Sequence, residues 1–464
     1  MNMNNRIAFI SEHASPLAIL GGTDSGGQNV YVAELASQLA KLDYQIDIYT
    51  RWENPSDPQI VNYQPGVRVI HVQAGPVEQI PKEEILCYMD EFYEEMLDFI
   101  TIKNTDYALI HANFWMSGLV AMKLKAALDI PFVITFHALG EVRKIHQKEA
   151  DKFPRERVTI EEEIVRKADQ LIAECPQDKE DLIKYYHASP ERITIIPCGF
   201  NPAEFFPMDK MLSREVLGLE TAEKTILQLG RMVPRKGVDN VIKALALLRH
   251  PGFAVRLVIV GGESETPGIN DSPELLRLRK LAESLNVADK VTFTGRKNRE
   301  ELKYYYDAAD IFVTTPWYEP FGITPLEAMA CGTPVIGADV GGIKYSVIDG
   351  KTGFLVPPDN PQVLCDRIAA LFADESLLRD MSEYALRHVH EHFTWEIIAR
   401  QMSDFYMLVL NKAAERATFG KRRLYQEQTL LKTGKREVIP LNILNGNTIS
   451  YLNGKGKGRN KYGS

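Results

Sequence analysis

The sequence has little of what marks a disulfide-stabilised, membrane-spanning or metal-binding protein. Its five cysteines are scattered and form no CxxC pair, so neither a disulfide framework nor a zinc site is predicted. No apolar run approaches the roughly 20 residues that a membrane span needs. The N-terminal residues have no apolar core of the length found in signal peptides. We therefore expect a cytoplasmic protein.

Several nucleotide- and metal-binding signatures are also missing. No GxGxxG with a downstream acid is present, which disfavours a dehydrogenase, and no P-loop Lys-Ser/Thr follows a glycine-rich loop. There is no DxD after a strand and no His/Cys spacing typical of metal ligands. We expect no metal and no cofactor.

What the sequence does have is the ordinary composition of a globular protein, with 464 residues of which 45% are hydrophobic and 25% charged. This length suffices for two domains, each with its own core. Strand-like runs alternate with helical patterns, which predicts an α/β fold with parallel, doubly wound sheets. The expected strands cover 6–11, 45–50, 67–72, 108–111, 131–137, 193–197, 225–230, 255–260, 290–294, 311–315 and 334–338.

The most informative stretch runs from Tyr318 to Ile336 and lies between two strand-like runs. Glu319 falls in a loop after the first strand, and Glu327 falls in the first turn of a short helix for which Thr324 is the expected N-cap. Ligands of open α/β sheets bind outside the carboxyl ends of the strands. We therefore expect both carboxylates at one binding site.

Two further loops follow strands and suit phosphate groups. Gly21–Gly27 is rich in glycine, which lets the backbone approach a ligand, and it precedes a helix whose N-terminal N–H groups attract anions. Arg231 and Lys236 lie on a basic loop after the strand 225–230, where two cations can hold a diphosphate. On the local residues alone, each loop is also compatible with a solvent-exposed loop that binds nothing.

The stretch Glu-Pro-Phe-Gly-Ile-Thr-Pro-Leu-Glu-Ala-Met-Ala-Cys-Gly-Thr-Pro-Val-Ile resembles the paired-glutamate motif of retaining glycosyltransferases with the GT-B fold. The most similar subgroup contains sucrose-phosphate synthases and D-inositol-3-phosphate N-acetylglucosaminyltransferases. The resemblance covers about residues 6–412. It implies two Rossmann-like domains that face each other across a cleft. The expected parts are an acceptor-side domain at 1–200, a nucleotide-sugar-binding domain at 201–393, a crossover helix at 394–415 and a basic, partly disordered tail at 416–464.

The resemblance also implies roles for individual residues. Asn29 and Arg157 match acceptor contacts, but Ala138 stands where the inositol-phosphate enzymes have a threonine, which argues against that acceptor. The expected catalytic residues are His137, Glu319, Arg231 and Lys236, and the expected donor contacts are Gly22, Arg231, Lys236, Lys297, Phe321, Gly322, Ile323 and Glu327.

The expected activity is a hexosyl transfer with retention from a nucleotide-diphosphate sugar, by family resemblance a UDP-sugar such as UDP-glucose. The acceptor would be a hydroxyl of a small sugar or polyol, phosphorylated or not. The alternatives are a sugar-nucleotide epimerase or phosphorylase of like fold, and a non-catalytic sugar-nucleotide sensor. A phosphorylase would need a pyridoxal lysine and a longer chain, and a sensor is expected to have lost His137, Lys236 or Glu319. No nucleic-acid partner is expected.

The tail from Arg416 onward differs in charge from the rest of the chain. It has eleven Lys and Arg against two acids, although the whole chain has a net charge of −8. The simpler hypothesis is that the tail is a solubilising extension, with residues 438–444 packed on the folded domains. The alternative is that the tail makes weak, salt-sensitive contact with an anionic surface such as a membrane leaflet.

Overall fold

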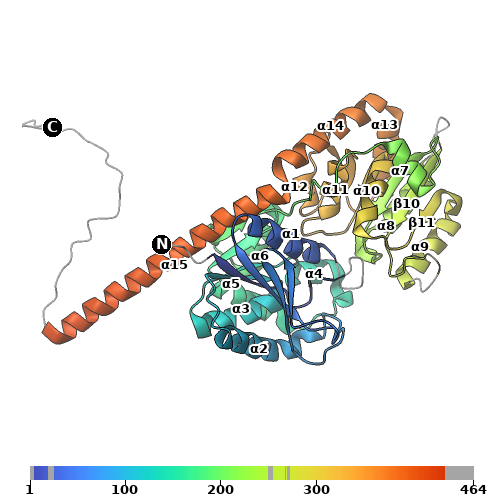
Figure 1. Ribbon diagram of the computed structural model, residues 1–464. Coiled ribbons are helices and arrows are strands. Elements are labelled where there is room, and N and C mark those ends of the chain that lie inside the picture. Colours follow the sequence, from blue (N-terminus) through green and yellow to red (C-terminus); the bar gives the residue numbers. More distant parts are fainter. Residues whose placement is uncertain (1–4, 19–25, 249–253, 267, 269–271, 434–464) are drawn as a thin grey trace, which may run out of the picture. The chain divides into compact units, whose positions relative to one another are not determined.

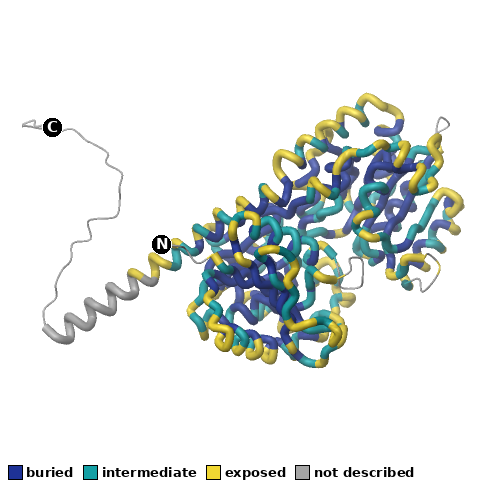
Figure 2. Tube along the Cα trace, viewed as in Figure 1, coloured by how far each residue is buried: buried dark blue, intermediate teal, exposed yellow. Residues whose placement is uncertain are grey.

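The computed structural model describes residues 5–18, 26–248, 254–266, 268 and 272–433 (Figure 1). The chain divides into two compact units, Met1–Asn411 and Lys412–Ser464. Both β-sheets belong to the first unit, and the strands lie inside it while exposed residues concentrate on the outer faces of the helices (Figure 2). Among the described residues, no helix combines the length and the apolar composition needed to cross a bilayer.

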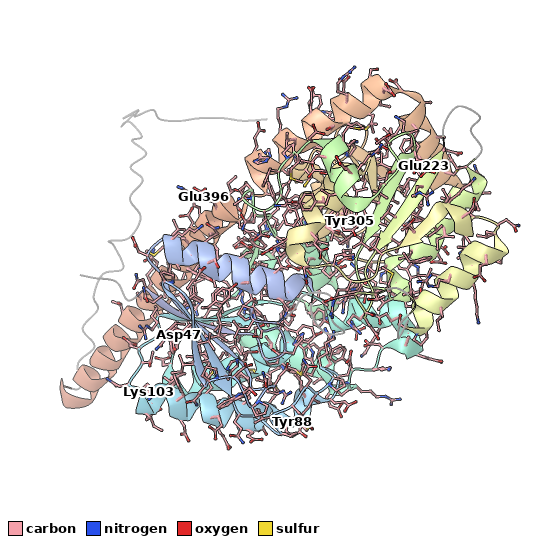
Figure 3. All side chains as sticks on the ribbon, turned by 45° about the vertical axis from the view of Figure 1, so that its right-hand side comes forward. Asp47, Tyr88, Lys103, Glu223, Tyr305 and Glu396 are labelled. Atoms are coloured by element: carbon pink, nitrogen blue, oxygen red, sulfur yellow. The ribbon has the colours of Figure 1, made fainter. Side chains whose placement is uncertain are left out.

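The first sheet has eight strands in the order β3-β4-β2-β1-β5-β6-β7-β8, and every neighbouring pair is parallel except β3 and β4. Buried charges inside it are paired. Asp47 on β2, labelled in Figure 3, accepts two 2.7 Å bonds from Arg68 and one from Tyr107. The strands are β1 (Arg6–Ile10), β2 (Gln45–Arg51), β3 (Ile60–Gln64), β4 (Val67–Val72), β5 (Leu109–Asn113), β6 (Phe132–Thr135), β7 (Gln170–Ala173) and β8 (Ile193–Ile195).

Helices cover both faces of this sheet. Phe9 and Ile48 pack with Leu35 of α1 on one face, whereas Ile10 and Ile110 belong to the core formed with α2, α3 and α5 on the other. The helices are α1 (Gly27–Lys41), η1 (Ile85–Tyr88), α2 (Met89–Ile102), α3 (Trp115–Leu128), α4 (Gly140–Gln147), η2 (Lys148–Ala150), α5 (Glu156–Lys167), α6 (Pro176–Tyr186) and η3 (Pro190–Arg192).

The second sheet has six parallel strands in the order β11-β10-β9-β12-β13-β14. They are β9 (Lys224–Leu229), β10 (Val255–Val260), β11 (Val291–Phe293), β12 (Ile311–Thr314), β13 (Val335–Ala338) and β14 (Gly353–Val356). Its helices are α7 (Lys210–Leu217), η4 (Pro234–Lys236), α8 (Val238–Leu247), α9 (Pro273–Ser284), η5 (Ala288–Lys290), α10 (Arg299–Ala308), α11 (Ile323–Ala330), α12 (Ile343–Ser346), α13 (Pro361–Ala373) and α14 (Glu375–His392). Two Rossmann-like, doubly wound halves result, as predicted.

The last helix, α15 (Trp395–Thr433), connects the cores of the two halves. Trp395 and Tyr406 are fully buried in the same apolar cluster as Phe9 of β1 and Phe312 of β12. Tyr406 also contacts His111 Nδ1 of β5 at 2.6 Å. The beginning of α15 therefore packs on the first half, in keeping with the predicted return of the chain. The domain limits themselves stay predictions.

Some elements differ from the prediction. The strands β3, β7 and β14 were not expected, and β3 is an antiparallel edge strand whose residues are half-buried or exposed. Helix α11 begins at Ile323 with Gly322 as its N-cap, so the expected N-cap at Thr324 is wrong and Glu327 lies in the second turn. Helix α15 continues to Thr433, beyond the expected end at 415. Residues 434–464, which include the glycine-rich end of the tail and the stretch 438–444, lie outside the described residues.

Candidate active site

A pocket with about 870 Å³ of empty space, partly open to solvent, lies between the two halves of the first unit. Residues from both halves line it. The first half contributes the start of α1 and the segments that follow β1, β5, β6 and β7; the second contributes the loops that follow β9 and β12. The carboxyl ends of two sheets thus meet at one cavity, the usual ligand position in such folds. Of the predicted site residues, Asn29, His137, Arg231, Glu319, Phe321, Gly322 and Ile323 line it.

Three cations surround Glu319. Lys236 Nζ lies 2.5 Å and Arg235 Nη1 3.5 Å from the same oxygen of Glu319, Oε2. Burial alone would raise the pKa of Glu319, but the charges of Lys236, Arg235 and Arg231 outweigh it and lower the pKa to about 2. Burial also lowers the pKa of Lys236, which the charge of Glu319 partly offsets. The second half therefore supplies an ionised carboxylate within a cationic cluster.

Two glycines hold the loops that carry these charges. Gly237, directly after Lys236, has a φ of +65°, and a Cβ there would meet the Thr315 carbonyl oxygen at 2.0 Å. The basic loop thus lies directly against the end of β12. Gly341 has a φ of +47°, and a Cβ there would lie 1.8 Å from the carbonyl oxygen of Glu319. Larger residues at either position would displace the loops.

Two helix N-termini open onto the pocket. Gly322 and Ile323 begin α11, and Gly26 and Gly27 begin α1. The first N–H groups of a helix have no partner inside the helix and, together with its dipole, favour anions. Asn29 is part of this arrangement because its Oδ1 accepts a 2.8 Å bond from Gly26 N.

His137 follows β6 and reaches the pocket from the first half. Its φ is +58°, an unusual left-handed conformation for a residue other than glycine. Its Nδ1 lies 3.1 Å from Glu174 Oε1 and its Nε2 lies 3.2 Å from Asn113 Oδ1. The ring also contacts Tyr31 edge to face, with centroids 4.7 Å apart. These contacts fix the orientation of the imidazole at the pocket wall.

The pocket has further polar residues that the sequence did not reveal. Lys82 and Arg143 add two cations on the first half, and Arg143 is paired with Asp151 at 3.0 Å. His13 lines the pocket as well, with its Nδ1 2.8 Å from the fully buried Glu12. Each lies alone in its segment, without a surrounding motif. For His13 the sequence offered one signal, the dipeptide Glu12-His13 directly after the expected strand 6–11.

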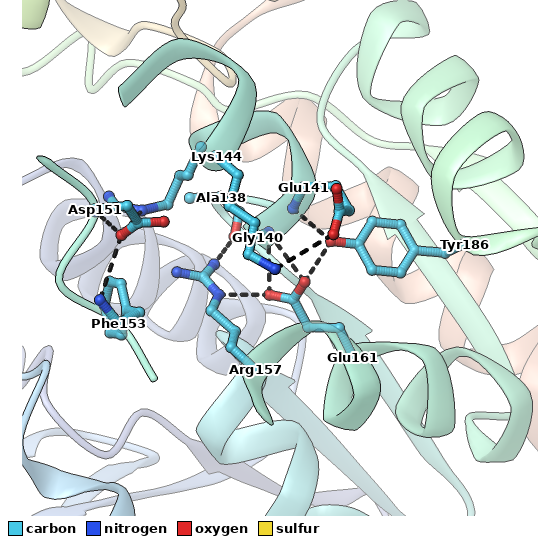
Figure 4. A network of polar contacts seen from close by, with 10 residues as sticks. Ala138, Gly140, Glu141, Lys144, Asp151, Phe153, Arg157, Glu161 and Tyr186 are labelled. Atoms are coloured by element: carbon cyan, nitrogen blue, oxygen red, sulfur yellow. Dashed lines mark hydrogen bonds and ion pairs between the residues drawn. The ribbon is translucent and has the colours of Figure 1, made fainter. Parts of the chain in front are cut away.

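Arg157, a predicted acceptor contact, is not among the residues that line the pocket. Only 1% of it is exposed, and its Nε donates a 2.7 Å bond to Glu161 (Figure 4). Its Nη2 donates to the carbonyl oxygen of Ala138, and its guanidinium lies 5.0 Å from the Phe114 ring. Since Ala138 and Phe114 line the pocket, Arg157 supports the wall from behind in this structure.

Glu327, the second carboxylate of the motif, is also set apart from the pocket lining. It is 2% exposed and accepts bonds from Arg299 Nη1 at 3.0 Å and from the Tyr306 hydroxyl at 2.9 Å. The sequence suggested that Glu319 and Glu327 share one binding site. In the structure Glu319 lines the pocket, whereas Glu327 is buried against Arg299 and Tyr306. Lys297 lies on the loop between β11 and α10 and does not line the pocket. Gly22 lies outside the described residues.

Arg299 connects Glu327 to the segment between the halves. Its Nε donates a 2.5 Å bond to Glu204. Asn201 Nδ2 lies 3.1 Å from Glu204 and 3.4 Å from both carboxylate oxygens of Glu34 on α1. Burial, and next the charge of Glu204, raise the pKa of Glu34 to about 7. A chain of polar contacts thus runs from α11 to α1.

Comparison with known proteins identifies the family. The model of the family "Glycosyltransferase Family 4" matches residues 25–204, and that of "Glycosyl transferases group 1" matches residues 209–388. A D-inositol 3-phosphate glycosyltransferase of Corynebacterium glutamicum is 37% identical over 407 residues, which cover 86% of this chain and 96% of that protein. The chain belongs to the group 1 glycosyltransferases.

Solved structures agree with this membership. A sucrose-phosphate synthase from Thermosynechococcus elongatus superposes with a TM-score of 0.81 at 35% identity, over 88% of this chain and all of that one. HepE of Anabaena, solved with UDP and glucose, shares the fold with a TM-score of 0.69 at 20% identity, over 86% of this chain and 98% of that one. The predicted GT-B fold and the predicted family are therefore confirmed, and this glycosyltransferase carries its candidate site between the two Rossmann-like halves.

Proposed function

We propose that the interdomain pocket binds a nucleotide-diphosphate hexose, with UDP as the nucleotide, and transfers the hexosyl group with retention to a small acceptor. The proposal is carried by the contacts that Lys236 and Arg235, on the loop after β9, make with Glu319, on the loop after β12. Arg235 and Glu319 line one pocket with His137 of the other half. Relatives named for inositol phosphate and for sucrose phosphate support a sugar or polyol acceptor.

On the donor side, Arg231 and Lys236 would hold the diphosphate, with Arg235 as a third cation. When the glycosidic bond breaks, negative charge develops on the leaving diphosphate. Fixed cations and the N-terminus of α11 stabilise that charge where it forms. The contact with Glu319 keeps Lys236 in place until a donor arrives. We propose that these groups take the role of a metal ion in this enzyme.

On the sugar side, Glu319 would accept hydrogen bonds from hydroxyls of the transferred hexose and offset the positive charge that the ring acquires. His137 would contact the same sugar from the opposite half. No side chain in the described pocket is assigned as a covalent nucleophile. We propose that the leaving phosphate takes the proton of the acceptor hydroxyl, which then attacks from the face that the phosphate leaves.

On the acceptor side, Lys82 and Arg143 give the first-half wall two cations against one carboxyl group, that of Glu174. This wall favours an acceptor with a phosphate or another anionic group over a neutral one. Asn29 is placed to contact the same acceptor. Ala138 has no hydroxyl to offer, so the phosphate would depend on Lys82 and Arg143. Arg157 would contribute indirectly, through the carbonyl of Ala138.

The test is a screen of purified full-length chain with UDP-, GDP- and ADP-glucose against inositol 3-phosphate, fructose 6-phosphate and their unphosphorylated forms. Released nucleoside diphosphate measures turnover, and proton NMR gives the anomeric configuration of the product. We expect one UDP-dependent product of retained configuration with a phosphorylated acceptor. An inverted product would contradict the mechanism, and turnover equal with both acceptor forms would contradict the anionic acceptor.

A further inference from the structure

A second groove lies on the other side of the loop that carries Glu319. It has about 1060 Å³ of empty space, and α4 and α6 of the first half form one side. The loops around Trp317 and Asp339–Gly341 form the other side. We call this second groove the outer groove and the interdomain pocket described above the donor pocket. The two cavities share four lining residues: Ala138, Tyr318, Glu319 and Pro320. A ligand in the outer groove would therefore be next to the reacting centre without overlapping the diphosphate cations.

The two cavities differ in charge. The donor pocket is lined by four cations, Lys82, Arg143, Arg231 and Arg235, against two carboxyl groups, Glu174 and Glu319. In the outer groove, burial raises the pKa of Asp178 to about 8, so this carboxyl is uncharged at neutral pH. Four further carboxyl groups line the groove against two lysines: Glu180, Asp181, Glu319 and Asp339 against Lys184 and Lys344. This balance disfavours a phosphate and suits a neutral ligand with many hydroxyls, since carboxylates accept bonds from them.

The outer groove also has exposed apolar surface. Trp317 is 36% exposed and Ile145 is 48% exposed. Trp317 is held at its base, because its backbone N donates a 2.9 Å bond to the Arg235 carbonyl oxygen. By contrast, Trp115 and Trp395 are fully buried. A partly exposed indole in a groove that also contains carboxyl groups is a surface on which the C–H face of a sugar ring can pack while its hydroxyls donate.

The groove is already bridged between the two halves. Lys344 Nζ donates a 2.9 Å bond to Gln177, and the His146 ring stacks on Tyr318 with centroids 5.0 Å apart. Gln147 also donates to the Tyr318 hydroxyl. These contacts keep the Tyr318 side chain, next to Trp317 in the chain, in a defined position, as a preorganised subsite requires.

We propose that the outer groove is a carbohydrate subsite that holds a neutral sugar ring of the acceptor, with Trp317 as the stacking surface and Asp181 as a hydroxyl acceptor. The assignment of this sugar to the acceptor rests on the proposed function, whereas sugar binding by the outer groove does not depend on it. An acceptor with two rings would place its reacting ring in the donor pocket and its second ring in the outer groove.

The test measures binding of sucrose, maltose and trehalose to the full-length chain by saturation-transfer NMR, without nucleotide. We expect saturable binding of at least one disaccharide, weakened about tenfold or more in Trp317→Ala and in Asp181→Asn. Tyr384→Ala, which removes an exposed aromatic side chain from α14, should bind like the parent. Failure of all three sugars to bind, or equal binding by the parent and Trp317→Ala, overturns the proposal.

A second readout separates this proposal from the proposed function. Hydrolysis of UDP-glucose without acceptor should be the same in the parent, Trp317→Ala and Asp181→Asn, since neither residue lines the donor pocket. If the parent releases no UDP with any acceptor of the screen described above, the proposed function fails, while the NMR result still decides the sugar subsite. If Trp317→Ala loses hydrolysis as well, the outer groove is not a separate subsite and the proposal is wrong.

Discussion

Lys236 Nζ and Glu319 Oε2 lie 2.5 Å apart. The two residues belong to the segments that follow two neighbouring strands, β9 and β12. Both groups are largely shielded from water, with 18% and 13% of their side chains exposed. A cation held this way is ready for a diphosphate, because the protein has already ordered it. The contact joins the basic loop to the motif loop before any donor binds.

Replacing Lys236 by alanine should therefore lower turnover of the donor strongly. Loss of one charged group that stabilises a developing anion costs about 3 kcal/mol, roughly a hundredfold in rate. Steady-state release of nucleoside diphosphate measures the effect. Lys243→Ala is the matched control, since Lys243 pairs with Asp239 on its own helix, α8, whereas Lys236 pairs with Glu319 of the pocket. Equal rates for Lys236→Ala and Lys243→Ala would remove the diphosphate assignment.

Arg299 should act as a positioning residue for Glu327. It donates to one carboxylate oxygen at 3.0 Å while Tyr306 donates to the other at 2.9 Å. If Glu327 binds the ribose hydroxyls, Arg299→Gln should raise the KM for UDP-glucose about tenfold and leave kcat within a factor of about three. Tyr306→Phe, which removes only the hydroxyl, should show the same pattern more weakly.

Arg400→Gln serves as a control for this experiment because Arg400 forms an exposed pair with Glu396. The melting temperature of each variant shows whether it is folded. A fall in kcat with unchanged KM would assign Arg299 and Glu327 to the chemical step instead of donor binding.

The stability of the protein should depend on the protonation of Glu34. Burial, and next the charge of Glu204, raise its pKa from 4.5 to about 7. Between these values the folded protein keeps a proton that the unfolded chain has lost, so the stability contributed by this group falls as the pH rises. Glu34→Gln removes this titration. Its melting temperature relative to the parent should be higher at pH 8 than at pH 4.5.

Other groups titrate in the same range, so only the difference between parent and variant is informative. Glu396→Gln provides the reference for an exposed carboxyl. The prediction is wrong if the difference in melting temperature between parent and Glu34→Gln is the same at both pH values.

Activity should survive chelation, because we propose that Arg231, Arg235 and Lys236, and not a metal ion, neutralise the leaving diphosphate. The experiment compares nucleoside diphosphate release before and after treatment with excess EDTA. An unchanged rate is expected. If EDTA abolishes turnover and magnesium or manganese restores it, the side chains do not provide enough charge and the assignment has to be revised.

Contiguous motifs explain what the sequence could predict. The residues Glu319, Phe321, Gly322 and Ile323 stand in one string that fixes a strand, a loop and a helix, and the structure places all four at the pocket. Arg231 lines the same pocket, and Lys236 contacts Glu319. In contrast, Lys82, Arg143 and His13 come from separate segments, and only the folding of the first half brings them together.

The assignment of Arg157 to the acceptor stays a prediction. In this structure Glu161, four residues later on α5, takes its guanidinium at 2.7 Å, as helical spacing allows. Glu327 was expected in the first turn of its helix, but α11 begins at Ile323, so Glu327 lies in the second turn. The strand β3 was missed because it is a short run, Ile-Val-Asn-Tyr-Gln, whose half-buried or exposed residues give no regular apolar alternation over its whole length.

The most direct test of the central claim is equilibrium binding of UDP, GDP and ADP to the full-length chain by calorimetry, with the parent and Lys236→Ala in parallel. We predict that UDP binds the parent most tightly of the three nucleotides and that Lys236→Ala weakens UDP binding about tenfold or more. Failure of all three nucleotides to bind the parent, or equal affinity in the parent and Lys236→Ala, would contradict it.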